Sequence, residues 1–241
     1  MTENRGKHPI ESMPVSVQSA VRAFVESLKN AIGSRLESLI VHGSAVRGGY
    51  RETASDIDSL VILSDTSLET LEALANPLAL ARNAYRIDSM ILKPSEIADA
   101  ADAFPIFYSD IQQCHVVATG SDPFATLVIP QENFRLRIEQ ELREAKIRLR
   151  RAVTDSFGMP DALAGALHRK VRQVRGPLRA LLQLKKTSCG DQIGEVLSAC
   201  ASEYRLDLGP LENIQRDPRA AHGAFRQLLD AAIADADRLA I

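Results

Sequence analysis

The spacing of apolar residues changes near residue 130, and this change constrains the fold more than any other feature of the sequence. Before it, short apolar runs typical of strands alternate with stretches whose apolar residues recur every three or four positions. After it, only the helical spacing remains. We therefore predict two domains, an α/β domain with a mixed sheet at residues 15–130 and an all-α helical bundle at residues 131–241.

The first half contains the signals of both strands and helices. Ser67 is a candidate N-cap, and Pro94 suits the first turn of a helix. The segment 104–118 is apolar with polar interruptions, which favours a strand over a helix. The pattern predicts helices at 17–32, at 67–82 and from Pro94 onward, and strands at 36–41, 60–63 and 85–92.

The second half shows only helical spacing. Gly158-Met159-Pro160-Asp161 should end the first helix, and Gly176-Pro177 should kink or split the second, because proline cannot continue the hydrogen-bond ladder of a helix. The predicted helical stretches are 134–152, 161–186, 191–203 and 218–239.

The charges of the chain are unevenly distributed, although the net charge of −2 gives no global sign of nucleic-acid or membrane binding. Residues 131–186 carry 14 Lys or Arg against 6 Asp or Glu, whereas the segments on either side are acidic. Such an asymmetry would suit a polyanionic ligand bound between two parts of the molecule.

Cysteine content and hydropathy indicate the cellular setting. Cys114, Cys189 and Cys200 are few and irregularly spaced, so neither a disulfide framework nor a zinc site is indicated. The N-terminus is polar, and no apolar stretch reaches membrane-spanning length. We expect a cytoplasmic protein without a membrane partner.

The stretch 41–63, VHGSAVRGGYRETASDIDSLVIL, carries most of the chemical information. In a strand, Asp56 and Asp58 leave the same face, and two carboxylates on one face repel each other unless a cation lies between them. Mg²⁺ prefers such oxygen ligands together with phosphates. Gly43-Ser44 follows a strand directly, so the backbone there can approach a phosphate closely and the serine hydroxyl can donate to it.

Asp88 lies in the next predicted strand, where an acid on a central strand would be costly without a partner. A third carboxylate beside Asp56 and Asp58 would allow a second metal ion to bind, or would accept the proton of an attacking hydroxyl. The sequence leaves both roles open. Two metal ions can hold the entering and leaving oxygens of an in-line phosphoryl displacement.

This arrangement resembles the signature of the polymerase-β-like nucleotidyltransferase superfamily. Its positions are occupied by Gly43, Ser44, Asp56, Asp58 and Asp88. The size of the chain and its helical second half are similar to those of the bacterial small-molecule and aminoglycoside nucleotidyltransferases. The motif covers about a fifth of the chain, and the helical half matches only in its layout.

The resemblance implies an enzyme that transfers a nucleoside monophosphate, AMP by expectation, from ATP or another nucleoside triphosphate. The triphosphate would bind at Gly43, Ser44 and the metal ions, with two Mg²⁺ per site held by Asp56, Asp58 and Asp88. A hydroxyl of a small molecule would attack the α-phosphate, and pyrophosphate would leave.

Further candidate residues lie in the basic second half. Lys170 and Arg172 are predicted to contact the nucleotide. Arg216 and His222 have a spacing similar to that of HEPN-type ribonuclease domains, although Asp217-Pro218 interrupts the stretch. Glu139, Glu141 and Glu144 could attract a polycationic acceptor, but partnership in ion pairs along a helix is the interpretation we favour.

Three alternatives stay open. The same chemistry could act on a protein hydroxyl, as in toxin–antitoxin-type adenylylation. The chain could be a non-catalytic nucleotide-binding regulatory module, or an interaction protein whose helical half contacts a partner. A nucleic-acid acceptor is disfavoured, because the 7 Phe and 4 Tyr, with no Trp, form no cluster suited to stacking bases.

Overall fold

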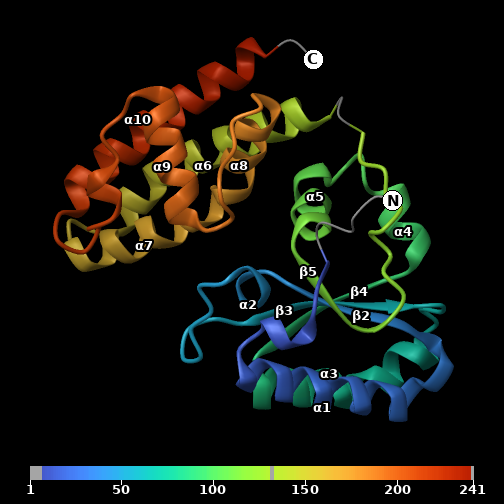
Figure 1. Cartoon of the computed structure of the whole chain (residues 1–241). Coiled ribbons are helices and arrows are strands. Elements are labelled where there is room, and N and C mark those ends of the chain that lie inside the picture. Colours follow the sequence, from blue (N-terminus) through green and yellow to red (C-terminus); the bar gives the residue numbers. More distant parts are fainter. Residues whose placement is uncertain (1–6, 131–132, 240–241) are drawn as a thin grey trace. The chain divides into compact units, whose positions relative to one another are not determined.

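The computed structural model describes residues 7–130 and 133–239 (Figure 1). Residues 1–6 of the polar N-terminus, residues 131–132 next to the predicted domain junction and residues 240–241 lie outside the described residues. Contacts divide the chain into two compact units, Met1–Ile129 and Pro130–Ile241. Within the described ranges, no helix is both long and apolar enough to cross a membrane.

Unit 1 is built on a five-stranded mixed sheet with the order β1-β5-β2-β3-β4. The pairs β1–β5 and β3–β4 are parallel, and the pairs β2–β5 and β2–β3 are antiparallel. The mixed sheet predicted from the sequence is therefore confirmed. The strands are β1 (Lys7–His8), β2 (Leu36–His42), β3 (Ile57–Leu63), β4 (Ile87–Leu92) and β5 (His115–Gly120).

Helices cover both faces of this sheet (Figure 1). On one face, α1 and α3 pack on a core that includes Phe24, Leu74 and Val61. On the other, α4 and α5 pack on a core that includes Ile97, Ile111 and Leu60. The helices are α1 (Val15–Ile32), α2 (Ser44–Arg47), α3 (Leu68–Tyr85), α4 (Pro94–Asp99) and α5 (Pro105–Gln113).

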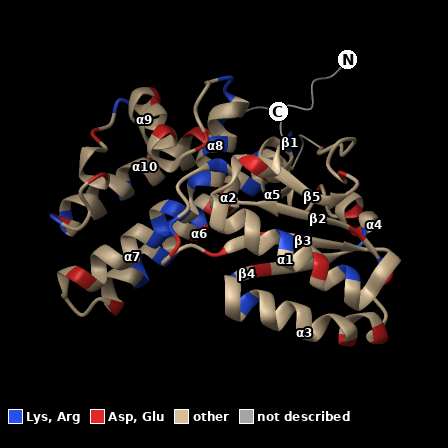
Figure 2. Ribbon diagram, turned by 60° about the horizontal axis from the view of Figure 1, so that its bottom comes forward, with Lys and Arg blue, Asp and Glu red and all other residues tan. Residues whose placement is uncertain are grey.

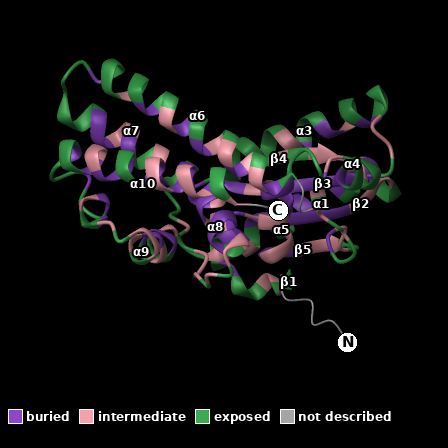
Figure 3. Ribbon diagram, turned by 90° about the horizontal axis from the view of Figure 1, so that it is seen from above, coloured by how far each residue is buried: buried purple, intermediate pink, exposed green. Residues whose placement is uncertain are grey.

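Burial on both faces explains the apolar composition of the central strands, which are mostly buried in Figure 3. Strand β3 has the residues Leu60 to Leu63 buried in succession, because alternate side chains enter opposite cores. Strand β4 lies at the edge of the sheet, and its Met90 side chain is 48% exposed. The predicted cap of α3 is confirmed, since Ser67 Oγ accepts a hydrogen bond from the Thr70 amide.

The prediction of a strand over 104–118 was wrong for its first part. Residues Pro105–Gln113 form α5, and only His115–Gly120 form a strand. The residues Phe104, Phe107, Tyr108 and Ile111 follow the i, i+3, i+4, i+7 spacing of a helical face. Pro105 also occupies the first turn of the helix, where its missing N–H costs nothing.

The described residues of unit 2 form helices and no strand. The expected break at Gly158 is present, and the expected split of the second helix falls at Val174, between α7 and α8. One face of the last helix, including Phe225, Leu228 and Leu229, is buried. The helices are α6 (Phe134–Asp155), α7 (Pro160–Gln173), α8 (Arg175–Leu184), α9 (Ile193–Tyr204) and α10 (Pro218–Arg238).

Candidate active site

The turn between β2 and α2 places Gly43 against the next strand. Gly43 has φ +75° and ψ −153°, a conformation that residues with a Cβ rarely adopt. Its carbonyl accepts hydrogen bonds from the amides of Val46 and Arg47, at 3.2 and 3.1 Å. A Cβ added at Gly43 would lie 2.2 Å from Asp58 Oδ2. The Asp58 carboxylate thus packs directly on the backbone of the Gly43-Ser44 turn.

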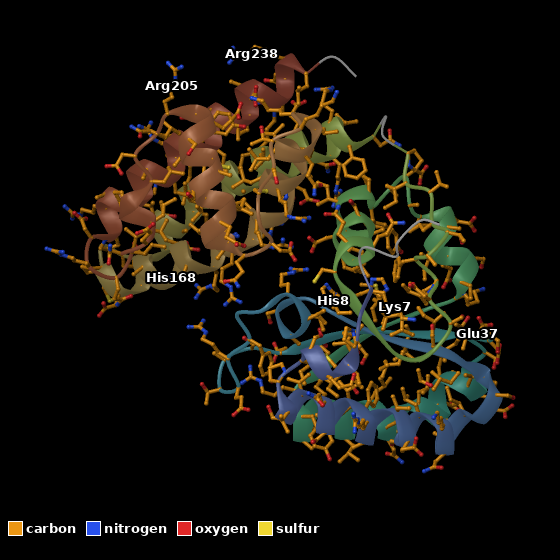
Figure 4. All side chains as sticks on the ribbon, viewed as in Figure 1. Lys7, His8, Glu37, His168, Arg205 and Arg238 are labelled. Carbon is orange, nitrogen blue, oxygen red and sulfur yellow. The ribbon has the colours of Figure 1, made fainter. Side chains whose placement is uncertain are left out.

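Asp58 and Asp88 are partners in register on the parallel strands β3 and β4. Paired residues of adjacent strands point to the same face of a sheet, and adjacent strands are about 4.8 Å apart. In the next residue of each strand, the hydroxyls of Ser59 and Ser89 are hydrogen bonded to each other at 2.8 Å. The register therefore brings these two residues together on one face. Asp58 is paired with His42 at the end of β2, whereas Glu37, labelled in Figure 4, lies near the start of that strand.

Asp56 has a different partner. Its Oδ1 atom accepts hydrogen bonds from Arg86 Nε at 3.0 Å, and Arg86 Nη2 lies 2.9 Å from the same oxygen. Arg86 ends α3 in a left-handed conformation, with φ 56° and ψ 35°, and its Nη1 also donates to the Thr53 carbonyl at 3.2 Å. Both members of the ion pair are exposed, at 45% and 58% of the side-chain area. The Asp56 carboxylate is thereby held by the guanidinium of Arg86.

The donor set fits a divalent cation in part. Within the described ranges, no three His, Cys, Asp or Glu side chains are grouped closely enough to hold a metal ion. The expected grouping of three acids is thus reduced to Asp58 and Asp88, with Asp56 turned to Arg86. Mg²⁺ is usually bound through one or two carboxylates and completed by substrate phosphates and water, so two carboxylates in register suffice.

Arg47, Arg51 and Ser44, which lie between Gly43 and Asp56, differ in their contacts. Arg47 Nη2 donates to Asp110 Oδ2 of α5 at 2.6 Å, and only 12% of the Arg47 side chain is exposed. This contact joins α2 to α5 over the face that carries Asp58. Arg51 is exposed. The partly buried hydroxyl of Ser44 makes no hydrogen bond to the described residues, which leaves it available to a ligand.

His42 precedes Gly43 and contributes no charge at neutral pH. Burial, together with the nearby Arg47 guanidinium, lowers the pKa of its imidazole to about 4. The ring packs edge-on against Phe107 of α5, with the centroids 5.8 Å apart. We therefore assign His42 to the packing between β2 and α5.

The low pKa of His42 predicts an acid-labile fold. The unfolded imidazole binds a proton near pH 6.5 and the folded one only near pH 4, so its contribution to stability is complete above pH 6.5 and is lost as the pH falls toward 4. We expect His42→Asn to remove roughly 3 kcal/mol of this pH dependence. The free energy of unfolding in urea, measured at several pH values, checks this prediction, with a variant of the exposed His168, His168→Asn, as control. Parallel curves for wild type and His42→Asn would refute the assignment.

The candidate residues of unit 2 lie at three separate places. Lys170 and Arg172 lie two positions apart on α7, so they point to different sides of the helix. Arg216 and His222 line one pocket of about 400 Å³. Glu139, Glu141 and Glu144 are confirmed as ion-pair partners of arginines four residues away on α6.

The comparisons with known proteins identify the first unit. The family model described as "Nucleotidyltransferase domain" matches residues 21–107, a segment that contains Gly43, Ser44, Asp56, Asp58 and Asp88. No curated protein matches the sequence. A crystal structure of spectinomycin adenyltransferase from Enterococcus faecialis with ATP and spectinomycin aligns with 91% of this chain and 99% of its own, at 13% identity and a TM-score of 0.47.

The family model covers about a third of the chain and matches the segment that carries the candidate site. Residues 21–107 match the nucleotidyltransferase domain model, and the prediction of a nucleotidyltransferase is confirmed.

One feature of the site was not predicted, although the sequence contains its signal. The tripeptide Ile-Asp-Ser occurs at 57–59 and again at 87–89, and the structure pairs the two copies residue for residue. This register places Arg86 beside Asp56, one position before each copy. The pairing of Arg47 with Asp110 had no comparable signal, because α5 was interpreted as a strand.

Proposed function

We propose that the protein transfers a nucleoside monophosphate, AMP by expectation, from a nucleoside triphosphate to a hydroxyl of a small molecule and releases pyrophosphate. The proposal extends the nucleotidyltransferase class to a donor, an acceptor and a metal requirement. It rests on Gly43, Ser44, Asp58 and Asp88.

The contact between Gly43 and Asp58 carries the proposal. Because the Asp58 Oδ2 atom occupies the space of a missing Cβ, the phosphate-binding turn and a metal-binding carboxylate meet without an intervening side chain. A ligand that touches both must present phosphate oxygens beside a divalent cation. A metal-bound nucleoside triphosphate has this form.

The residues have distinct roles in this proposal. Asp58 and Asp88 would hold Mg²⁺, which supplies neutralisation of the charge that develops around the α-phosphate. The Gly43 backbone and the Ser44 hydroxyl bind phosphate oxygens and fix the direction of attack. Asp88 lies on an exposed edge strand, where its carboxylate can instead accept the proton of the attacking hydroxyl. Asp56 joins the site when its ion pair with Arg86 opens.

A transfer screen tests the proposal. Nucleoside triphosphates labelled at the α-phosphate are incubated with the protein, Mg²⁺ and a library of hydroxyl-bearing compounds. We expect label on an acceptor, release of unlabelled pyrophosphate, and no product after removal of the metal by EDTA. Product labelled only from a γ-labelled triphosphate would identify a kinase and overturn the proposal.

The ion pair of Asp56 gives a prediction for metal binding. Arg86→Ala frees the Asp56 carboxylate and adds one negative charge beside Asp58, so we expect the affinity for Mn²⁺ to rise about fivefold, since exposed ion pairs contribute up to about 1 kcal/mol. Electron paramagnetic resonance of free Mn²⁺ measures this in the absence of nucleotide. Arg82→Ala, an exposed arginine on the same helix, should leave the affinity unchanged. Equal affinities in all three proteins would contradict the assignment.

A further inference from the structure

A groove of about 820 Å³ opens between α6 and α7 within unit 2. The residues of α7 that line it form adjacent pairs that recur every four positions, and those of α6 recur within the same helical period, so the groove follows one face of each helix. Lys and Arg gather on these two helices in Figure 2. Four of them, Arg148, Arg151, Arg169 and Lys170, line the groove.

Small residues keep the groove open. Its lining includes Ala152 on α6 and Ala162, Gly165 and Ala166 on α7, where larger side chains would fill the space between the helices. A Cβ added at Gly165 would meet only the Arg169 Nη1 atom, at 3.7 Å. The Arg169 guanidinium therefore lies over the glycine and inside the groove.

The cations of the groove differ in how they are neutralised. On α6, Arg148 is paired with Glu144, and Arg151 with Asp155 at 3.2 Å. On α7, Arg169 makes no ion pair within the described ranges, and Lys170 Nζ bonds only the neutral Gln173 amide at 3.0 Å. The two basic residues of α7 that line the groove thus have no acidic partner within the described ranges.

The remaining acids of the groove do not neutralise this pair. Asp155 is engaged by Arg151, and Asp161 accepts a hydrogen bond from Gln215 at 3.0 Å. Four cations against two acids leave a net positive groove. Such a groove attracts anions, and neighbouring cationic donors suit phosphate oxygens.

The size and lining of the groove favour a small ligand. Its volume falls within the range of about 300–1,000 Å³ that is typical of small-molecule pockets. None of the described residues that line it is aromatic, whereas proteins that bind single-stranded nucleic acids stack bases on aromatic rings. A phosphate-bearing small molecule fits both observations.

We propose that the α6–α7 groove binds a small phosphate-bearing ligand, with Arg169 and Lys170 as its principal contacts. This goes beyond the proposed transfer reaction, because the groove lies wholly within unit 2 and needs neither Asp58 nor Asp88. The phosphate can belong to the donor nucleotide or to a second, phosphorylated molecule.

Calorimetric titration of the full chain tests the groove. Inorganic pyrophosphate, ATP and glucose 6-phosphate are titrated without divalent metal, at low and high salt. We expect binding of at least one probe that weakens with salt. Arg169→Ala should raise its Kd about tenfold. Arg150→Ala, an exposed arginine of α6 outside the groove, should leave the Kd unchanged. No binding, or equal losses in both variants, would overturn the proposal.

A second variant tests whether the ligand needs the space of the groove as well as its cations. Gly165→Leu keeps every cation and fills the space, and it replaces a glycine within a helix, so it should fold at least as well as wild type. We expect loss of probe binding without a lower Tm. Unchanged binding in Gly165→Leu would show that the phosphate lies elsewhere and would end the proposal.

The three probes distinguish the two sources. A loss of ATP affinity in Arg169→Ala assigns the groove to the donor nucleotide, and a loss confined to glucose 6-phosphate assigns it to a second molecule. Binding of a single-stranded RNA that depends on Arg169, without binding of any small phosphate, would refute a small ligand. Because the probes are titrated without divalent metal and without an acceptor, binding in the groove is measured whether or not transfer occurs, so failure of the transfer reaction and failure of this proposal are distinguishable.

Discussion

Replacing Gly43 by alanine is expected to lower kcat/KM of nucleotidyl transfer at least about 100-fold and to destabilise the fold by about 2 kcal/mol. The stability cost follows from a backbone conformation that alanine rarely adopts. The activity loss follows from the new Cβ, which would lie 2.2 Å from Asp58 Oδ2 and must displace that carboxylate. Displacements of about 1 Å at a reacting centre cost factors of this size.

Gly49→Ala is the matched control for Gly43→Ala. Gly49 also has a positive φ, of +82°, but a Cβ there would meet nothing within 4 Å. It should show the loss of stability without the loss of activity. Urea unfolding and kcat/KM measured on both variants separate backbone strain from displacement of Asp58. Full activity in Gly43→Ala would show that the position of this carboxylate is irrelevant to the reaction.

The second large effect is expected from Asp58→Asn. Removing one of two carboxylates in register should lower kcat about 1,000-fold, because the metal ion supplies several kcal/mol of transition-state stabilisation. Stability should change by no more than about 1 kcal/mol, because a repulsive pair of like charges across two strands is also removed. Thermal unfolding and kcat on the acceptor found in the screen check both statements.

Asp99→Asn controls for the loss of a surface acid. Asp99 lies exposed on α4 and is absent from the paired carboxylates of β3 and β4. It should keep wild-type kcat and Tm. Metal-dependent transfer at the wild-type rate in Asp58→Asn would remove the basis of the proposed function.

The sequence determined the chemical core of the site because its signals are local. A glycine and a serine after an apolar run, followed by Asp-Ile-Asp before a second run, specify a turn and a strand without reference to distant residues. The match at residues 21–107 covers this segment. The long helices of unit 2 were predictable for the same reason, because the spacing of apolar residues within each segment is that of a helix.

Side-chain partners across elements were not predictable in this way. Asp56 was expected to be a metal ligand, whereas its contact with Arg86 depends on the register of β3 and β4. The groove of unit 2 depends on which faces of α6 and α7 meet. Composition predicted the basic charge of this segment, but only the packing of the helices selects Arg169 and Lys170 over Arg172.

The edge position of β4 has a consequence for heat inactivation. In the described part of the sheet, β4 is hydrogen bonded to a neighbour on one side only, whereas β3 is held on both. Local opening of such a strand requires less free energy than global unfolding. Fraying of β4 would carry Asp88 away while the inner strands stay paired. We therefore expect the enzyme to lose activity on warming at temperatures below those at which circular dichroism detects global unfolding.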